Sequence, residues 1–140
     1  MRIDVPESKK LVYEMTMPIQ WGDMDAMGHV NNVQYFRYME TLRLEWMRSV
    51  GFVPDPTGEG PVIVNTFCNY HVQLEYPGEI VARLYVANPG RSSFDKFVTL
   101  SRTDRPDVVY ASGGATTVWV DLPKQKSVPL PQRLRELIGG

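Results

Sequence analysis

The chain has 140 residues, of which 43% are hydrophobic and 22% charged, and its formal net charge is -1. This length suits one core, so we expect a single domain over residues 1–140. The balanced charge provides no basic field, which excludes nucleic acid as an expected partner. The first residues lack the apolar run of a signal peptide, and nowhere do about 18 apolar residues follow one another. We therefore expect a cytoplasmic protein that does not enter a membrane.

Two hydrophobic periodicities divide the first third of the chain. Apolar residues on alternate positions predict a strand over residues 13–21, and Pro18 within it indicates an edge strand or a bulge. Over residues 35–50 the apolar spacing changes to three and four, which predicts one long helix. Asn31 is the expected N-cap of this helix, and Gly51 is expected to end it.

The remainder of the chain is dominated by strands. A loop rich in proline and glycine is predicted over residues 52–60, where it suits the cover of a ligand entrance. Strands are then predicted over 62–74, 79–87, 92–102 and 108–122, with a bulge at Gly113–Gly114, and a short helix over 131–138. The order favours an α+β fold, a curled antiparallel sheet of about five strands around one long central helix.

The segment between the first strand and the long helix carries the polar residues Asp23, Asp25, Gly28, His29, Asn31 and Asn32. A helix start offers unpaired N–H groups and the positive end of the helix dipole, which suit a developing oxyanion. Singly, each residue has a structural interpretation, such as a turn or a helix cap. Together they favour half of an acyl-transfer site, with a carboxylate facing a carbonyl group.

The sequence disfavours two other kinds of chemistry. Asp23, Asp25 and Gly28 match positions of a calcium-binding loop, but Met27 and Gln34 stand where oxygen ligands are needed. We therefore expect no metal, and no other cofactor. A serine or cysteine nucleophile is disfavoured too, because no G-x-S-x-G elbow occurs and the only cysteine, Cys68, lies mid-strand, where a small buried hydrophobe is expected.

The segment Gln20–Asn32, continuing to Glu40, resembles the signature of the 4-hydroxybenzoyl-CoA thioesterase-like branch of the hotdog proteins. Weaker similarities lie at Glu75–Glu79, Arg91–Phe94 and Val118–Asp121, so the resemblance spans nearly the whole chain. It implies the hotdog fold and the hydrolysis of an acyl-CoA thioester to a free acid and coenzyme A.

The resemblance also implies roles for individual residues. Asp25 acts as nucleophile or as general base, and the backbone N–H of Asn32, after the close turn at Gly28, polarises the thioester carbonyl. Relatives often carry Tyr or His where this chain has Asn32, but the backbone amide is the group that matters. The predicted substrate-binding set comprises Asp23, His29, Asn31, Tyr35, Asn65, Thr66, Arg91, Ser92 and Ser93.

A homodimer, with a tetramer as the larger possibility, is implied by the same resemblance and agrees with the open edges of a lone sheet. The pocket then lies at the interface between the two copies. There a residue of the strand predicted over 62–74, such as Asn65, Thr66, Asn69 or a neighbour, completes the site of the other copy.

Two further functions stay open at this point. The first is a non-catalytic protein that binds acyl-CoA in the same pocket. The second is hydration or dehydration of a bound acyl chain, which is weaker because His29 and His71 lack the expected spacing relative to an acid. The acyl group, the choice between coenzyme A and a carrier protein, and the choice between nucleophile and base remain undecided.

Overall fold

The computed structural model describes residues 3–139 of the chain. Its elements are β1 (Lys10–Ile19), a 3₁₀ turn (Trp21–Asp23), α1 (Asn32–Ser49), β2 (Glu59–Tyr70), β3 (Gly78–Ala87), β4 (Ser93–Arg102), β5 (Ala111–Asp121), β6 (Lys126–Ser127) and α2 (Gln132–Ile138). None of the described helices combines the length and the apolar character needed to cross a membrane.

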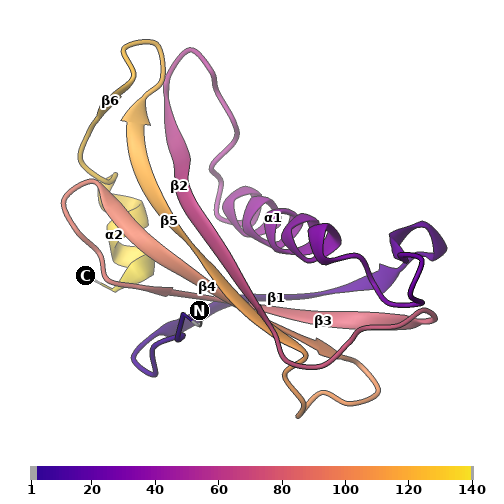
Figure 1. Ribbon diagram of the computed structural model, residues 1–140. Coiled ribbons are helices and arrows are strands. Elements are labelled where there is room, and N and C mark those ends of the chain that lie inside the picture. The colour runs from indigo at the N-terminus through magenta and orange to yellow at the C-terminus, as the bar shows by residue number, and fades with distance from the viewer. Residues whose placement is uncertain (1–2, 140) are drawn as a thin grey trace.

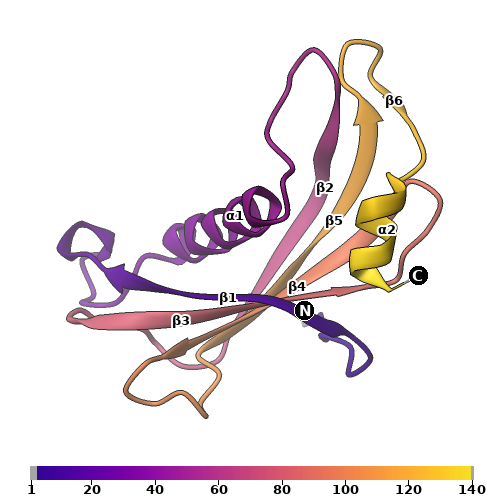
Figure 2. The same cartoon turned by 180° about the vertical axis from the view of Figure 1, so that it is seen from behind.

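The strands form one antiparallel sheet in the order β1-β3-β4-β5-β2, with the short β6 paired to β5. Figure 1 shows this sheet curling so that α1 lies in its concave side. The view from behind in Figure 2 shows α2 beside the turn between β3 and β4. There Arg135 donates hydrogen bonds to the carbonyl groups of Gly90 and Arg91. The predicted α+β arrangement is confirmed.

Helix α1 follows the predicted pattern at both ends and along its apolar face. The side chain of Asn31 accepts a hydrogen bond from the Val33 N–H, as an N-cap does. Gly51 follows the helix with φ of +89°, a conformation that glycine adopts at little cost. The apolar stripe is buried against the sheet through Tyr35, Met39, Leu42 and Trp46.

The predicted bulge at Gly113–Gly114 is wrong. Both glycines pair in regular register with Cys68 and Phe67 of β2. A Cβ at Gly113 would lie 2.5 Å from the Phe67 carbonyl oxygen and 2.7 Å from Cε of Met39. Gly113 is therefore required because α1 comes close to the sheet at this point, and not because the strand bulges.

Other boundaries differ by a few residues from the predicted ones. Strand β1 begins at Lys10 and ends before Trp21, which belongs to the 3₁₀ turn. Pro18 lies in this edge strand, as predicted. Strand β2 starts earlier than predicted, ends at Tyr70, and carries the irregular register between Ile63 and Asn65.

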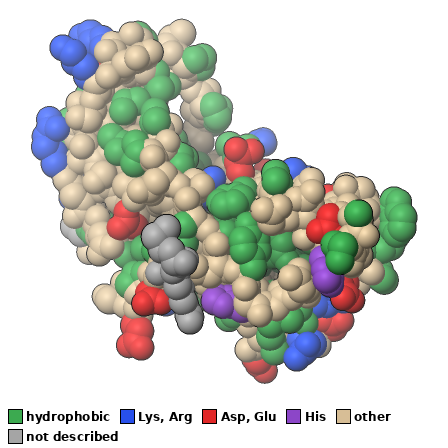
Figure 3. All heavy atoms as spheres, viewed as in Figure 1, with side chains coloured by type: hydrophobic (Ala, Val, Ile, Leu, Met, Phe, Trp, Pro, Cys, Tyr) green, Lys and Arg blue, Asp and Glu red, His purple; other side chains and the backbone are tan. Residues whose placement is uncertain are grey.

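Strand β2 forms the other edge of the sheet and is open to solvent. Its apolar side chains Val62, Ile63 and Val64 are 38%, 38% and 57% exposed. In the space-filling view of Figure 3, hydrophobic side chains gather on the part of the surface where β2 runs. An exposed apolar edge strand offers unpaired backbone groups and apolar area to another chain.

Candidate active site

Asp25 lies in a tight turn just before α1. Its Oδ1 accepts hydrogen bonds from the N–H groups of Met27 at 2.8 Å and His29 at 3.2 Å, and its own N–H donates to the His29 carbonyl. Gly28 adopts φ of +79° in this turn, which a residue with a side chain rarely adopts. The turn thus fixes the exposed carboxylate through one oxygen, and Oδ2 has no hydrogen-bond partner within residues 3–139.

The first residue of α1 brings a free amide to the same region. Asn31 N–H donates to the Asp23 carbonyl and Val33 N–H to the Asn31 side chain, whereas the N–H of Asn32 finds no acceptor in the described part of the chain. The carbonyl of Asn32 accepts a hydrogen bond from the Tyr70 hydroxyl at 3.1 Å. The helix start is therefore anchored to the end of β2 while one of its donors stays available.

Asp23 is buried, with 4% of its surface exposed, and its carboxylate is fully engaged. One oxygen accepts from the Tyr38 hydroxyl at 2.7 Å and the Gln20 N–H at 2.9 Å, and the other accepts from Arg37 at 2.9 Å. Burial and the neighbouring Asp23 raise the pKa of Tyr38 above its usual range. Asp23 thus ties the loop to α1, which leaves no oxygen free for a ligand.

His29 and Tyr35 flank the turn. The His29 side chain is 34% exposed, with Nε2 3.7 Å from the Glu75 carboxylate. The buried Tyr35 hydroxyl accepts a hydrogen bond from the Leu74 N–H, and its ring packs edge-on against Tyr70. Burial raises the pKa of Tyr35, and the negative charge of Asp25 adds to this rise.

The predicted coenzyme A turn lies at the other end of α1. The Ser92 carbonyl accepts a hydrogen bond from the Trp119 N–H, while the Gly90 N–H donates to the Ser93 carbonyl. Arg91 is exposed in the same turn. Trp119 packs against Phe52, which lies three residues after the end of α1. Within one chain, this turn is therefore separated from Asp25 by the length of the helix.

The predicted residues of β2 lie apart from Asp25 as well. Asn65 and Thr66 line a hollow of about 330 Å³ together with Phe97 and Thr116. The Asn65 side chain accepts a hydrogen bond from the Thr116 N–H. Asn69 donates to the carbonyl of Ile3 near the start of the chain. A single chain thus assembles the helix-start residues but neither the turn nor the β2 residues around them.

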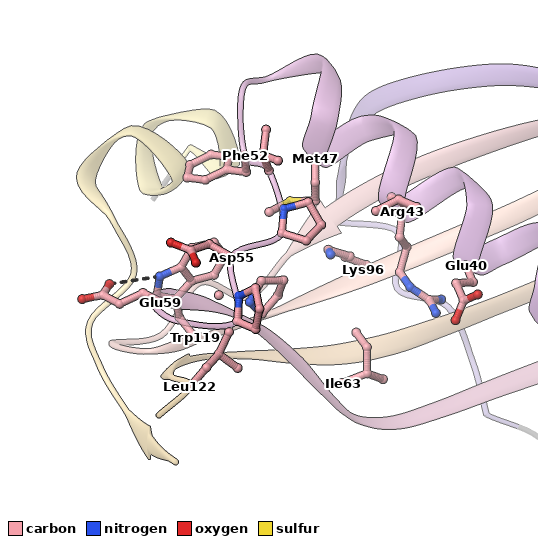
Figure 4. Close-up of a pocket in the computed structure, with 16 residues that line it drawn as sticks. Glu40, Arg43, Met47, Phe52, Asp55, Glu59, Ile63, Lys96, Trp119 and Leu122 are labelled. Carbon is pink, nitrogen blue, oxygen red and sulfur yellow. Dashed lines mark hydrogen bonds between the residues drawn. The ribbon is translucent and has the colours of Figure 1, made fainter. Parts of the chain in front are cut away.

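A cleft that sequence reasoning did not find lies beside the second half of α1. It has a volume of about 380 Å³, and residues 52–56 of the loop after the helix form part of its lining. Figure 4 shows the side chains that line it. Its walls are mostly apolar and include Leu44, Met47, Phe52, Ile63, Trp119 and Leu122.

Lys96 of β4 also lines this cleft. Its side chain is 2% exposed and lies over the rings of Trp46 and Phe94, 5.7 and 5.3 Å from their centres. Burial, together with the positive charge of Arg43, lowers the pKa of Lys96 to about 7. The sequence contained a signal for the burial of Lys96, because this residue alternates with Phe94 and Val98 on the apolar side of its strand.

Comparisons with known proteins agree with this architecture. The model of the thioesterase-like superfamily matches residues 19–138. A solved structure from Pseudomonas aeruginosa, described as "a putative Thioesterase", is 33% identical, with a TM-score of 0.89 over 93% of this chain and 100% of that one. "A putative acyl-CoA thioesterase" from Xanthomonas campestris is 31% identical, with a TM-score of 0.78 over 86% of this chain and 100% of that one.

A further relative comes from Aquifex aeolicus. It is named "Putative esterase" and is 28% identical over 123 residues, which cover 86% of this chain and 92% of that protein. The family match covers most of the chain, and the solved relatives share its sheet and its long helix. The chain therefore belongs to the thioesterase-like superfamily and has the hotdog fold.

Proposed function

We propose that this protein is an acyl-CoA thioesterase whose catalytic carboxylate is Asp25. The observation that carries the proposal is that, within residues 3–139, Asp25 is held by one oxygen and has the other free, while the N–H of Asn32 at the helix start has no acceptor. The membership in a thioesterase-like superfamily and the names of the solved relatives support the same chemistry.

In the proposed reaction the N–H of Asn32 donates to the thioester oxygen, where negative charge develops in the transition state. The free oxygen of Asp25 either attacks the carbonyl carbon or removes a proton from the water that does so. In both routes water adds its oxygen to the acyl carbon in the net reaction, and the thiolate of coenzyme A leaves and takes up a proton. Gly28 allows the substrate to approach the turn closely.

We further propose that the working site is shared by two copies joined at their β2 edges. Antiparallel pairing of two identical strands requires a two-fold axis perpendicular to the sheet, so both α1 helices stay on one face. The Tyr70 end of one β2 then lies beside the Glu59 end of the other. Because Tyr70 holds the carbonyl of Asn32, the helix start of one copy is carried toward the cleft of the other.

In this proposed dimer, the predicted residues of the turn before β4 and of β2 also lie near the shared site. The cleft is lined by Trp119, whose N–H donates to Ser92, so the turn that holds Arg91 and Ser93 adjoins the wall of the cleft. In the proposed complex Arg91 and Ser93 bind the coenzyme A phosphates. Asn65 and Thr66 lie at the middle of β2 and therefore at the proposed seam. A homodimer is the proposed unit, and a tetramer of two such dimers is compatible with it.

The test is Asp25→Asn, assayed by release of free thiol from acyl-CoA substrates of increasing chain length and with aryl groups. We expect kcat/KM to fall by about 10²-fold or more, as for an essential catalytic group, with unchanged unfolding temperature. Asp107→Asn is the matched control, because Asp107 is an exposed carboxylate in the turn between β4 and β5.

Near wild-type hydrolysis by Asp25→Asn would contradict the assignment of Asp25. If the wild-type protein binds acyl-CoA saturably but releases no thiol from any of the substrates, the protein is the non-catalytic binder instead.

A further inference from the structure

We propose that the cleft beside α1 takes an acyl group with a carboxylate at its far end, and that Lys96 selects this group by pairing with the carboxylate. The inference rests on the proposed thioesterase function, which it refines by naming the substrate class. It makes Lys96 a specificity-determining residue at a distance from the reacting carbonyl.

The first support is the state of the Lys96 side chain. It is almost completely buried, yet the structure of residues 3–139 provides no hydrogen bond or ion pair for its Nζ, only the rings of Trp46 and Phe94. A buried amine without a partner is costly, and its ordinary remedy is an opposite charge or an acceptor. Figure 4 shows Lys96 at the floor of the cleft, so a bound ligand is positioned to supply that partner.

The second support is the arrangement of the other charges around the cleft. Arg43 of α1 also lines it, and the pKa of Arg43 is lowered by burial, with nearby Glu40 acting in the opposite sense. Of the three carboxylates that line the cleft, Glu40 acts on Arg43, and the other two accept hydrogen bonds from neighbouring residues. Asp55 accepts hydrogen bonds from the N–H and hydroxyl of Thr57, and Glu59 accepts from the indole N–H of Trp119.

These contacts leave Lys96 as the cationic group without an oxygen partner at the floor, and Arg43 adds positive charge near it. The walls are apolar and suit methylene groups. An acyl chain that ends in a methyl group contacts the apolar walls of the cleft but leaves the Lys96 amine unpaired. A chain that ends in a carboxylate fills the same space and also neutralises the amine, so the cleft discriminates between the two.

The experiment measures kcat/KM for the adipoyl, pimeloyl and suberoyl thioesters of coenzyme A and for the hexanoyl, heptanoyl and octanoyl thioesters of equal length. We expect the wild-type protein to prefer the carboxylate-bearing member of at least one pair. Lys96→Met keeps a similar side-chain volume without the amine, and the preference is expected to fall by about tenfold or more, since an unpaired polar group then opposes binding. Lys126→Met, on the exposed β6, is the control and should keep it.

A parallel measurement separates this inference from the proposed activity. Binding of uncleavable thioethers of coenzyme A, with and without a terminal carboxylate, is measured by calorimetry for the same three proteins. Lys96-dependent preference in binding supports the inference even if no thioester is hydrolysed. Hydrolysis of octanoyl-CoA without any preference for a carboxylate in the wild-type protein, or a preference only for a hydroxyaryl thioester, overturns it while leaving the proposed activity intact.

Discussion

Asp23 and Asp25 lie two residues apart in the same loop and have opposite environments. Asp23 is buried and bound by three donors, whereas Asp25 is exposed and bound through one oxygen. The sequence places two carboxylates before a helix but does not tell which one folds inward. That choice is made by Tyr38 and Arg37, which reach Asp23 from the next turns of α1, and such contacts depend on the loop conformation.

This difference predicts different effects of the same substitution. Asp23→Asn weakens charge-assisted hydrogen bonds to buried donors, and we expect the free energy of unfolding to fall by about 1–3 kcal/mol. Asp25→Asn, at an exposed site, is expected to change it by less than about 1 kcal/mol. Urea denaturation of both variants checks this pair, and an equal loss in the two would contradict the assigned roles.

Replacing Lys96 by an uncharged residue is expected to stabilise the protein by an amount that depends on pH. Its pKa is lowered from 10.5 to about 7, so between these pH values the unfolded chain binds a proton that the folded chain does not. Stability of the wild-type protein therefore rises with pH through this window, and below pH 7 the full cost of burying the ammonium group is present. The titratable groups that line the same cleft as Lys96 are Arg43, Glu40, Asp55 and Glu59, and of these Arg43 is the one whose charge lowers the pKa of Lys96.

We expect Lys96→Met to be more stable than the wild-type protein by on the order of a few kcal/mol at pH 6, with the gain shrinking toward pH 9. Chemical denaturation at both pH values measures it. Lys126→Met, in exposed β6, should show no comparable change. A loss of stability in Lys96→Met at pH 6 would show that the amine has a partner in the folded chain.

At the level of elements, periodicity predicted most of the fold. The spacing of three and four along α1 and the alternation in the strands report which side is buried, and burial is what those patterns encode. Boundaries shifted where local signals compete, as at Trp21, which continues the alternation but lies in a 3₁₀ turn. Gly113 shows the limit of this reasoning, because a glycine in a strand indicates a bulge or a close approach and the sequence alone does not separate them.

The close approach of α1 to β5 predicts a large effect of one methyl group. Gly113→Ala places Cβ against the Phe67 carbonyl oxygen and the Met39 side chain, and only the latter is free to move. We expect a loss of about 2 kcal/mol or more in the free energy of unfolding, from overpacking. Ser127→Ala, on the exposed β6, is the control in thermal and urea denaturation. A Gly113→Ala variant as stable as Ser127→Ala would place α1 farther from the sheet.

For the whole molecule, the sequence predicted the helix-start residues because they are contiguous, from the Asp25 turn to the Asn31 cap. It did not predict the cleft, whose walls come from α1, the following loop, β2, β4 and β5. Nor does a single chain bring the cleft to Asp25. Residues that meet only after folding, or only after pairing of two chains, leave no local pattern in the sequence.

Because the β2 edge is open, we expect it to pair with a second copy, and this pairing determines the mass of the protein in solution. We expect sedimentation at about 32 kDa or a multiple of it, twice the 16.0 kDa of one chain. Introducing lysine at both Val62 and Val64 places charge on this edge and should yield monomers with lost thioesterase activity. Val109→Lys, at a similarly exposed apolar residue in the turn between β4 and β5, should leave the mass unchanged.

The central claim, that Asp25 of one copy serves the cleft of the other, is tested most directly by mixing two defective variants. Asp25→Asn removes the carboxylate, and Leu44→Trp fills the cleft at a side chain that is 44% exposed. After denaturation and refolding together, half of the dimers carry one chain of each kind, and each of these holds one intact site. We predict that the mixture recovers about a quarter of wild-type thiol release although each variant alone is inactive. A mixture no more active than its two components would contradict the shared site.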